Sequence, residues 1–188
     1  MELGDNMTTD INQEQYNKFT NLPLLSYNCI SYLMENDELI WKLLKYNEAK
    51  AYSRADLTRA EKADLIYAGQ DNITDFRVFM DVGQDDSWLH ESTVLRITPI
   101  ELIPANHIYG HVTMGFEVYS HYKINTLANY TTRIDTITQK LIEIFNGADI
   151  TGVGRLYFDA RQNRSKAIII GTIPMKGRAL IMCNHMLG

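Results

Sequence analysis

Residues 108–121 alternate between apolar and polar side chains over an unusually long stretch. The apolar side chains are Ile108, Val112, Met114, Phe116 and Val118, and those of the opposite side are Tyr109, His111, Thr113, Glu117, Tyr119 and His121. A period of two residues is typical of a β-strand with one face in a core. At ~3.3 Å per residue the strand would reach about 40 Å, well beyond the usual length of about 5 to 6 residues. The sequence therefore predicts one long strand whose outward face meets water or another protein.

A second strand is predicted over 92–103, followed by a turn at 104–106. Pro99 lies within this strand, and because proline has no N–H to donate, it favours an edge position or a β-bulge. The two strands together predict a hairpin over about 92–121. A hairpin of this length would project past a small domain.

Helical periodicity covers about 24–46, as two short helices or one bent helix, and Asn36 can cap the second of them. Thr58 and Glu61 have the spacing of a capping box, in which each side chain bonds the other's backbone N–H. The helix that they open is expected to end near Ala68, with Gly69 in the left-handed conformation.

An amphipathic helix is predicted over about 131–146, begun by Thr131 or Thr132 and stopped by Asn146 and Gly147. Alternation also predicts a strand from 75 to 81 and three short strands at 155–159, 166–172 and 178–184. This order predicts an α+β fold with a mostly antiparallel sheet, a long hairpin and helices on one side. We expect an N-terminal arm over 1–22 and a single domain over 23–188.

The composition is that of a globular protein, with 45% hydrophobic and 22% charged residues in a chain of 188. Its formal charge of −5 argues against a protein that grips phosphate backbones, which needs clustered Lys and Arg. Neither a secretory signal nor a membrane-spanning run is evident, so a soluble protein made in the cytoplasm is expected. Cys29 and Cys183 match no metal motif and are predicted to be buried free thiols rather than a disulfide.

Few residues have the spacing of a reaction centre. His107 and His111 are four residues apart, which in a strand separates them by ~13 Å, too far to share one metal ion. Asp85 and Asp86 are interpreted as an acidic loop, and the segment 152–154 (GVG) as a tight turn without the following residues of a phosphate loop. No catalytic, cofactor or metal site is therefore predicted.

Tyrosine is frequent, with 11 copies, several of them at positions predicted to be exposed. Tyr109 and Tyr119 fall on the outward face of the long strand, and Tyr122 and Tyr130 in loops. Tyrosine is enriched in protein interfaces because it offers a large contact area with few rotatable bonds. The alternative is that these rings pack over the rim of the sheet.

Three segments carry a family resemblance: the capped helix DLTRAEKADL, the meander STVLRITPIELIPANHIYGHVTMGFEVYSH, and the helix with its following strand, LIEIFNGADITGVGRLYFD. In this order they resemble small proteins of the bacteriophage head–tail interface, the tail terminators and the related neck or tail-completion proteins. The resemblance covers about 24–184 and consists of a pattern of elements rather than of invariant residues.

The resemblance implies a structural virion subunit that forms a ring, usually of six subunits, with twelve as an alternative. Such a ring joins the tail tube to the connector, and genomic DNA passes through its lumen without sequence-specific binding. Six copies at −5 each would carry −30, and an acidic lumen repels DNA so that it slides. The expected partners are further copies of the chain, the phage connector or adaptor, and tail-tube or other neck proteins. The expected location is the virion.

Two functions of different classes follow. For a ring subunit, we expect the hairpin to reach a neighbouring copy through the residues Ile100, Glu101, Tyr109, His111 and Tyr119. The alternative is a small hydrolase-like enzyme with a pocket near His111, Glu117 and His121. A third, intermediate hypothesis is an adaptor that binds another protein without forming a ring.

Overall fold

The computed structural model describes residues 23–80, 91–104, 110–150, 154–158, 164–168 and 176–187. For residues 102, 104, 110, 111, 158, 164–168 and 176–187 it describes the backbone alone. The proposed arm over 1–22 lies outside the described residues. No helix in the described part is long and apolar enough to cross a membrane.

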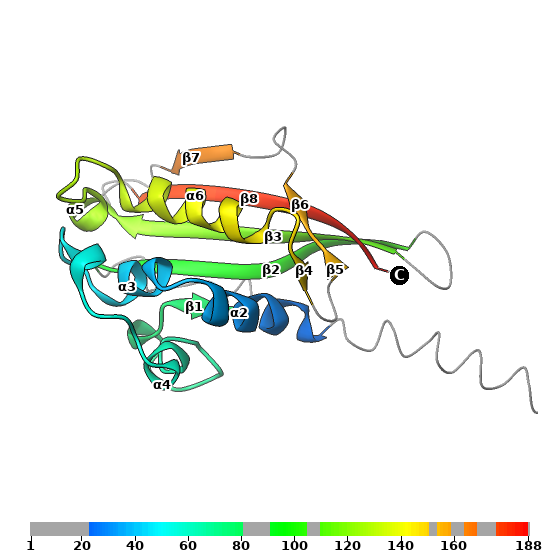
Figure 1. Ribbon diagram of the computed structural model, residues 1–188, viewed down its shortest axis with the longest axis horizontal. Helices are drawn as coiled ribbons and strands as arrows, with labels where there is room; N and C mark the ends of the chain where they lie inside the picture. Colours follow the sequence, from blue (N-terminus) through cyan, green and yellow to red (C-terminus); the bar gives the residue numbers. More distant parts are fainter. Residues whose placement is uncertain are drawn as a thin grey trace, which may run out of the picture.

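A six-stranded sheet forms the centre of the molecule, in the order β1-β2-β3-β8-β6, with β7 also paired to β8 (Figure 1). Its strands are β1 (Val78–Phe79), β2 (Thr93–Pro104), β3 (Gly110–His121), β6 (Tyr157–Phe158), β7 (Arg164–Ile168) and β8 (Lys176–Leu187). Among the described strands of this sheet, β1 is parallel to its neighbour and the others pair antiparallel. A second, two-stranded sheet joins β4 (Asp149–Ile150) to β5 (Gly154–Arg155). The predicted α+β class is confirmed.

The long hairpin is present as the antiparallel pair β2–β3, in register from Thr93 opposite Ser120 to Pro104 opposite Gly110. The register shifts between Pro99 and Glu101, which leaves one extra residue on β2. The predicted bulge at the proline is thus confirmed, and its cause is the missing N–H, which cannot take part in the ladder.

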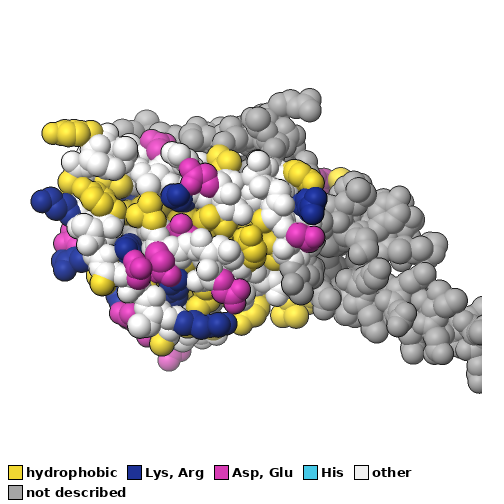
Figure 2. Space-filling model, in the orientation of Figure 1, with side chains coloured by type: hydrophobic (Ala, Val, Ile, Leu, Met, Phe, Trp, Pro, Cys, Tyr) yellow, Lys and Arg dark blue, Asp and Glu magenta, His cyan; other side chains and the backbone are white. Residues whose placement is uncertain are grey.

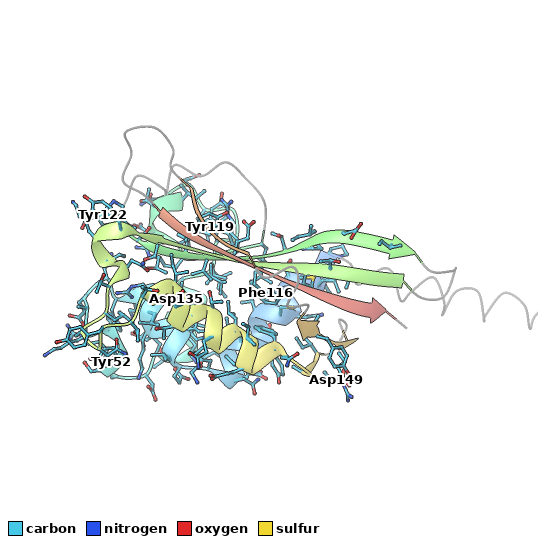
Figure 3. The ribbon with its side chains drawn as sticks, turned by 90° about the horizontal axis from the view of Figure 1, so that it is seen from above. Tyr52, Phe116, Tyr119, Tyr122, Asp135 and Asp149 are labelled. Carbon is cyan, nitrogen blue, oxygen red and sulfur yellow. The ribbon has the colours of Figure 1, made fainter. Side chains whose placement is uncertain are left out.

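Three helices cover one face of the sheet, here called the inner face: α2 (Leu25–Asn36), α3 (Leu39–Lys45) and α6 (Arg133–Phe145) (Figures 1 and 3). Four of the apolar side chains predicted to face the core do so, Val112, Met114, Phe116 and Val118, whereas Ile108 lies outside the described residues. Phe116 lies 4.7 Å from Phe145 between ring centroids. Cys29 of α2 is buried there as a free thiol, and burial raises its pKa to about 12.

The opposite, outer face of the sheet carries a second, smaller apolar cluster, which corrects the prediction that this side of β3 is exposed. Phe79 of β1 packs there with Val94 and Tyr119, and the rings of Tyr67 and Phe76 add to it. Figure 3 labels Phe116 and Tyr119 on opposite sides of the sheet. The segment that precedes β1 brings these rings, so Tyr119 is packed rather than exposed. Thr113 and His121, on the same face, are also buried.

The capping box at Thr58 is present, with the Glu61 amide donating to the Thr58 hydroxyl and the Glu61 carboxylate accepting from the Thr58 N–H. Hydrogen bonds from Lys45 and Thr58 lower the pKa of Glu61 to about 2. The helix, α4 (Arg59–Ala63), is shorter than predicted. It stops because the carbonyl of Leu65 accepts from the N–H of Val78, which draws the chain toward β1.

Other helix boundaries follow the expected local signals, with one exception. The Thr132 hydroxyl caps α6, and Gly147 takes a φ of 83° after its end. Asn36 does not cap α3; its side chain instead donates to a carbonyl of α2, and the Asp37 carboxylate accepts from the Ile40 N–H. Asp37 is the better acceptor because Asn36 is still inside α2. Short helical turns complete the fold: η2 (Ala51–Ser53), η3 (Ile73–Asp75) and α5 (Tyr122–Asn125).

The C-terminal strands differ from their predicted bounds. The strand predicted at 155–159 is reduced to β6, and the one predicted at 166–172 begins two residues earlier, as β7. The last strand is much longer than the predicted 178–184, because β8 pairs with β3 along the whole of both strands, from Lys176 to Leu187. The strand predicted over 75–81 is reduced to β1, after η3.

Arg133, at the start of α6, is fully buried and joins four backbone segments. Its guanidinium donates to the carbonyl oxygens of Leu43 at 2.5 Å, Tyr46 at 2.8 Å, Glu48 at 3.0 Å and Ile124 at 3.1 Å. Burial lowers the pKa of Arg133 to about 10. The side chain thus holds the end of α3, the chain that follows it, and α5 against α6.

We predict that Arg133→Met lowers the free energy of unfolding by ~3–5 kcal/mol, because buried carbonyl oxygens lose their donor. Chemical denaturation followed by circular dichroism measures the change. Arg54→Met is the control, since Arg54 is exposed and its ion pair with Glu48 lies in water. An equal effect of the two substitutions would contradict the structural role of Arg133.

Candidate functional site

The part of the hairpin farthest from α5 has an open edge. On the side of β2 away from β3, β1 pairs only with Leu95 and Arg96. From Ile97 to Pro104, therefore, that edge of β2 has no strand partner among the described residues. Unpaired N–H and C=O groups on such an edge are free to meet another chain. We call residues 99–103 of β2, with Gly115 of β3, the hairpin end.

Two large apolar side chains are exposed at the hairpin end. Ile100 is 48% exposed and Ile103 is 51% exposed, and the carboxylate of Glu101 lies between them in sequence and is also exposed. Glu101 pairs with Thr113 and Ile103 with His111, so both project from the outer face of the sheet. Fully burying an isoleucine is worth roughly 1.5–3 kcal/mol, and since each of these two is already half buried, a contact would gain about half of that per side chain.

Gly115 determines how Ile100 lies on this surface. Ile100 is the extra residue of the bulge, and its Cγ1 lies 2.7 Å from the position that a Cβ on Gly115 would occupy. Only a residue without a side chain leaves room for Ile100 to lie flat across β3. The bulge and the glycine together present one face of the isoleucine to solvent.

The predicted contact residues are only partly brought together. Ile100 and Glu101 are exposed at the hairpin end as expected, and the backbone of His111 lies opposite Ile103. Tyr109 lies outside the described residues. The prediction of exposure was wrong for Tyr119, which is buried under the outer cluster.

The polar surroundings of Tyr119 are those of a packed side chain. Its hydroxyl donates to the Glu117 carboxylate at 2.7 Å, and the Arg96 guanidinium lies 5.6 Å from its ring centroid. The alternation of β3 indicated which side chains share a face but not what would cover that face.

The three residues of the alternative enzyme pocket do not converge. His111, Glu117 and His121 all lie on β3, and ten residues separate the two histidines, a distance of roughly 33 Å along a strand. His121 has a structural position at the start of α5, where its Nδ1 accepts from the Lys123 N–H. By backbone position, the two histidines lie too far apart along the strand to line one small pocket.

No group of three or more His, Cys, Asp or Glu side chains within the described ranges could hold a metal ion. Asp85, Asp86 and His107 lie outside those ranges. Gly154, singled out in the segment 152–154, has a φ of 87° and pairs with Ile150 across the two-stranded sheet. Residues 152 and 153 of that segment lie outside the described residues.

The chain matches the family described as YomW over residues 37–172. This covers more than half of the chain. The chain belongs to the YomW family. The family is named after a gene product of a Bacillus phage region, which agrees with the phage-related character of the resemblance. No curated protein matches the chain.

The YomW match contains β1, β2, β3, α6 and the hairpin end. It begins at Asp37, the first residue after α2, so the loop before α3 is its N-terminal boundary. The surface described above is therefore part of the family's shared region rather than of a terminal extension.

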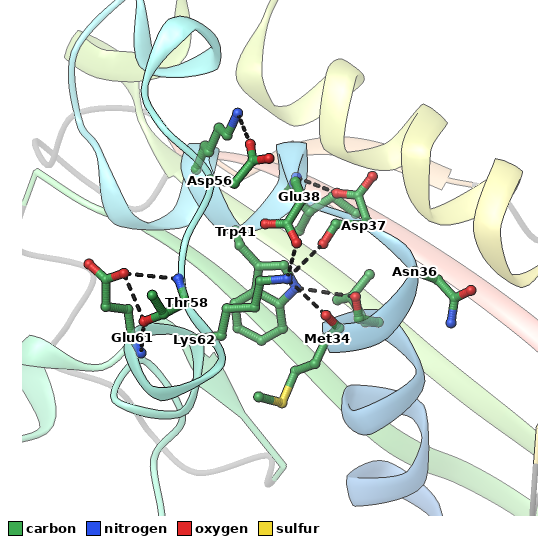
Figure 4. A network of polar contacts seen from close by, with 12 residues as sticks. Met34, Asn36, Asp37, Glu38, Trp41, Asp56, Thr58, Glu61 and Lys62 are labelled. Atoms are coloured by element: carbon green, nitrogen blue, oxygen red, sulfur yellow. Dashed lines mark hydrogen bonds and ion pairs between the residues drawn. The ribbon is translucent and has the colours of Figure 1, made fainter.

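Lys62 is a buried charge that no local sequence signal indicated, and it belongs to the scaffold (Figure 4). Its ammonium donates to the carbonyls of Met34 at 2.8 Å and Asp37 at 3.2 Å and to the Glu38 carboxylate at 2.5 Å. The Trp41 ring centroid lies 6.0 Å away. Three acceptors match the three protons of the ammonium, so the group joins α4 to the corner between α2 and α3 and is not available as a base or nucleophile.

We predict that Gly115→Ala and Ile100→Ala are coupled. In the wild-type background the added methyl group displaces Ile100, whereas with Ala at position 100 the clash disappears. The two substitutions should therefore show a coupling free energy of about 0.5 kcal/mol, the low end for residues in contact, because Ile100 is half exposed and can shift. Denaturation of the four members of the double-mutant cycle measures it. Additive effects would show that Ile100 does not lie on Gly115.

Proposed function

We propose that the protein is a structural subunit of a phage particle, which assembles with copies of itself into a ring at the head–tail interface, as a tail terminator or neck protein. The observation that carries the proposal is the pair of exposed isoleucines on an open-edged end of a long hairpin. Membership in the YomW family supports the phage setting. A ring of about six copies is the form that the resemblance implies.

The hydrophobic effect favours assembly through the hairpin end. Each copy exposes apolar area at Ile100 and Ile103 that a neighbour would remove from water. A stable contact buries more than ~1,000 Å² in total, so the two isoleucines would form its centre and polar residues its rim. Glu101, between them, fixes the orientation of the partner rather than the strength of binding.

We predict that the purified full chain assembles, and that Ile100→Asp with Ile103→Asp returns it to single subunits. The two added carboxylates would have to be buried without partners, which costs more than the contact yields. Light scattering and native mass spectrometry over a range of concentrations measure the mass.

Gln139→Asp is the matched control, because it adds a carboxylate at an exposed position of α6 on the helix-covered side. This variant should assemble like the wild type. A wild-type chain that stays a single subunit at the highest concentrations would overturn the proposed function. So would an isoleucine variant that assembles normally.

A further inference from the structure

Three tyrosines are exposed at the end of the molecule opposite the hairpin end. Tyr52 is 37% exposed, Tyr122 49% and Tyr130 98%. Figure 3 labels Tyr52 and Tyr122 at the same end, where α5 follows β3. We call these three residues, with Lys50, the tyrosine end. Since β3 runs from Gly110 to His121, its two ends lie roughly 36 Å apart.

Tyr130 has a strained backbone, with a φ of 65°. A left-handed conformation costs a residue with a side chain roughly 1–2 kcal/mol, which is why glycine or asparagine usually occupies it. Two hydrogen bonds that close the turn, from the Tyr130 N–H to the Leu127 carbonyl and from the Leu127 N–H to the Thr131 carbonyl, hold this conformation within the subunit. The ring itself is 98% exposed and is therefore available to another subunit.

The loop that carries Tyr130 is held in place by several bonds. The Leu127 N–H donates to the Thr131 carbonyl at 2.9 Å, and the Tyr130 N–H donates to the Leu127 carbonyl at 3.1 Å. The Ala128 N–H donates to the Ala49 carbonyl at 2.9 Å, which ties the loop to the chain carrying Lys50 and Tyr52. A contact on this surface therefore orders little new backbone, and its entropic cost is low.

Among the described residues, each end has one exposed charge without an ion pair, and the two charges are of opposite sign. At the hairpin end, Glu101 is exposed and makes no ion pair with the described residues. At the tyrosine end, Lys50 is likewise exposed without an ion pair in the described ranges, whereas Arg54 and Lys123 are neutralised by Glu48 and Glu91. Figure 2 shows Lys and Arg side chains projecting at that end of the molecule, with an apolar side chain beside them.

We propose that the tyrosine end receives the hairpin end of a second copy of the chain. Ile100 and Ile103 of one copy would pack on Tyr122 and Tyr130 of the next, with Glu101 facing Lys50. A contact of the hairpin end with itself would bring two Glu101 carboxylates together, whereas the contact between unlike ends pairs opposite charges. The resulting interface is head to tail, and such interfaces close into rings when the rotation per subunit permits. This inference rests on the proposed function and names the acceptor surface.

A mixing experiment tests the two surfaces separately. One variant carries Ile100→Asp and Ile103→Asp, and the other carries Tyr122→Asp and Tyr130→Asn. Each alone should remain a single subunit. Mixed in equal amounts, they should form a one-to-one dimer and nothing larger, because each variant keeps one intact end. Native mass spectrometry with one variant isotopically labelled identifies the pair.

The outcomes separate this inference from the proposed function. If the wild type assembles but the tyrosine variant also assembles alone, or if the mixture gives no dimer, the tyrosine end is not the acceptor and the ring proposal stands. If the wild type does not assemble at all, the proposed function fails and this inference fails with it.

Tyr130→Asn gives a second, independent test, because stability and assembly should change in opposite directions. Asparagine tolerates the left-handed conformation, so the thermal midpoint of the subunit should stay the same or rise. Association should weaken at least tenfold, measured by sedimentation across a concentration series. Tyr27→Asn, which removes another exposed tyrosine ring on α2, is the control and should change association less than twofold. Unchanged association of the Tyr130 variant would overturn the inference.

Discussion

The arrangement of the helices against the sheet depends on the buried guanidinium of Arg133. It enters the core without a carboxylate partner in hydrogen-bonding reach among the described residues and is satisfied by carbonyl oxygens at the end of α3, in the chain that follows and in α5. The end of α3 is a favourable place for a cation, because the last carbonyls of a helix have no partner within it and carry partial negative charge. The lowered pKa of Arg133 expresses the cost of removing the charge from water. The surface that carries Lys50, Tyr52 and Tyr122 is built on the segments that this one side chain joins.

The sheet uses its two faces differently along its length. The inner face of β3 is buried throughout its described side chains, from Val112 to Val118. On the outer face, the cluster around Phe79 and Tyr119 covers only the part next to β1, because β1 pairs with just two residues of β2. Beyond it, Ile100 at the bulge lies over Gly115, and Ile100 and Ile103 remain about half exposed. One pair of strands therefore has a closed end and an open end, and the open end is the one suited to association.

Local features were predictable from the sequence, and remote ones were not. The alternation of β3 and the helix caps at Thr58 and Thr132 depend only on residues close together in the sequence, and these predictions were confirmed. The burial of Tyr119 depends on rings that arrive from the segment before β1, about forty to fifty residues earlier in the chain, and periodicity carries no information about them. Arg133 bonds carbonyls 85 to 90 residues away in α3 and after it, and a backbone acceptor has no signature in the sequence. At the candidate site, Pro99 predicted the bulge from the sequence alone. The contact of Ile100 with Gly115 was not predictable, because it depends on the register in which β2 pairs with β3.

The open edge of β2 would invite uncontrolled strand addition if it were regular. The bulge between Pro99 and Glu101 breaks the regular spacing of the backbone N–H and C=O groups along β2. Strand-to-strand extension along this edge is therefore blocked in its middle, while the side chains of Ile100 and Ile103 remain available. A contact made through side chains has one geometry, set by the shape and charge of the receiving surface, whereas backbone pairing tolerates slips in register. An assembly with a fixed number of copies needs a fixed rotation between neighbours, and the blocked edge with its exposed isoleucines favours that kind of contact over an open-ended one.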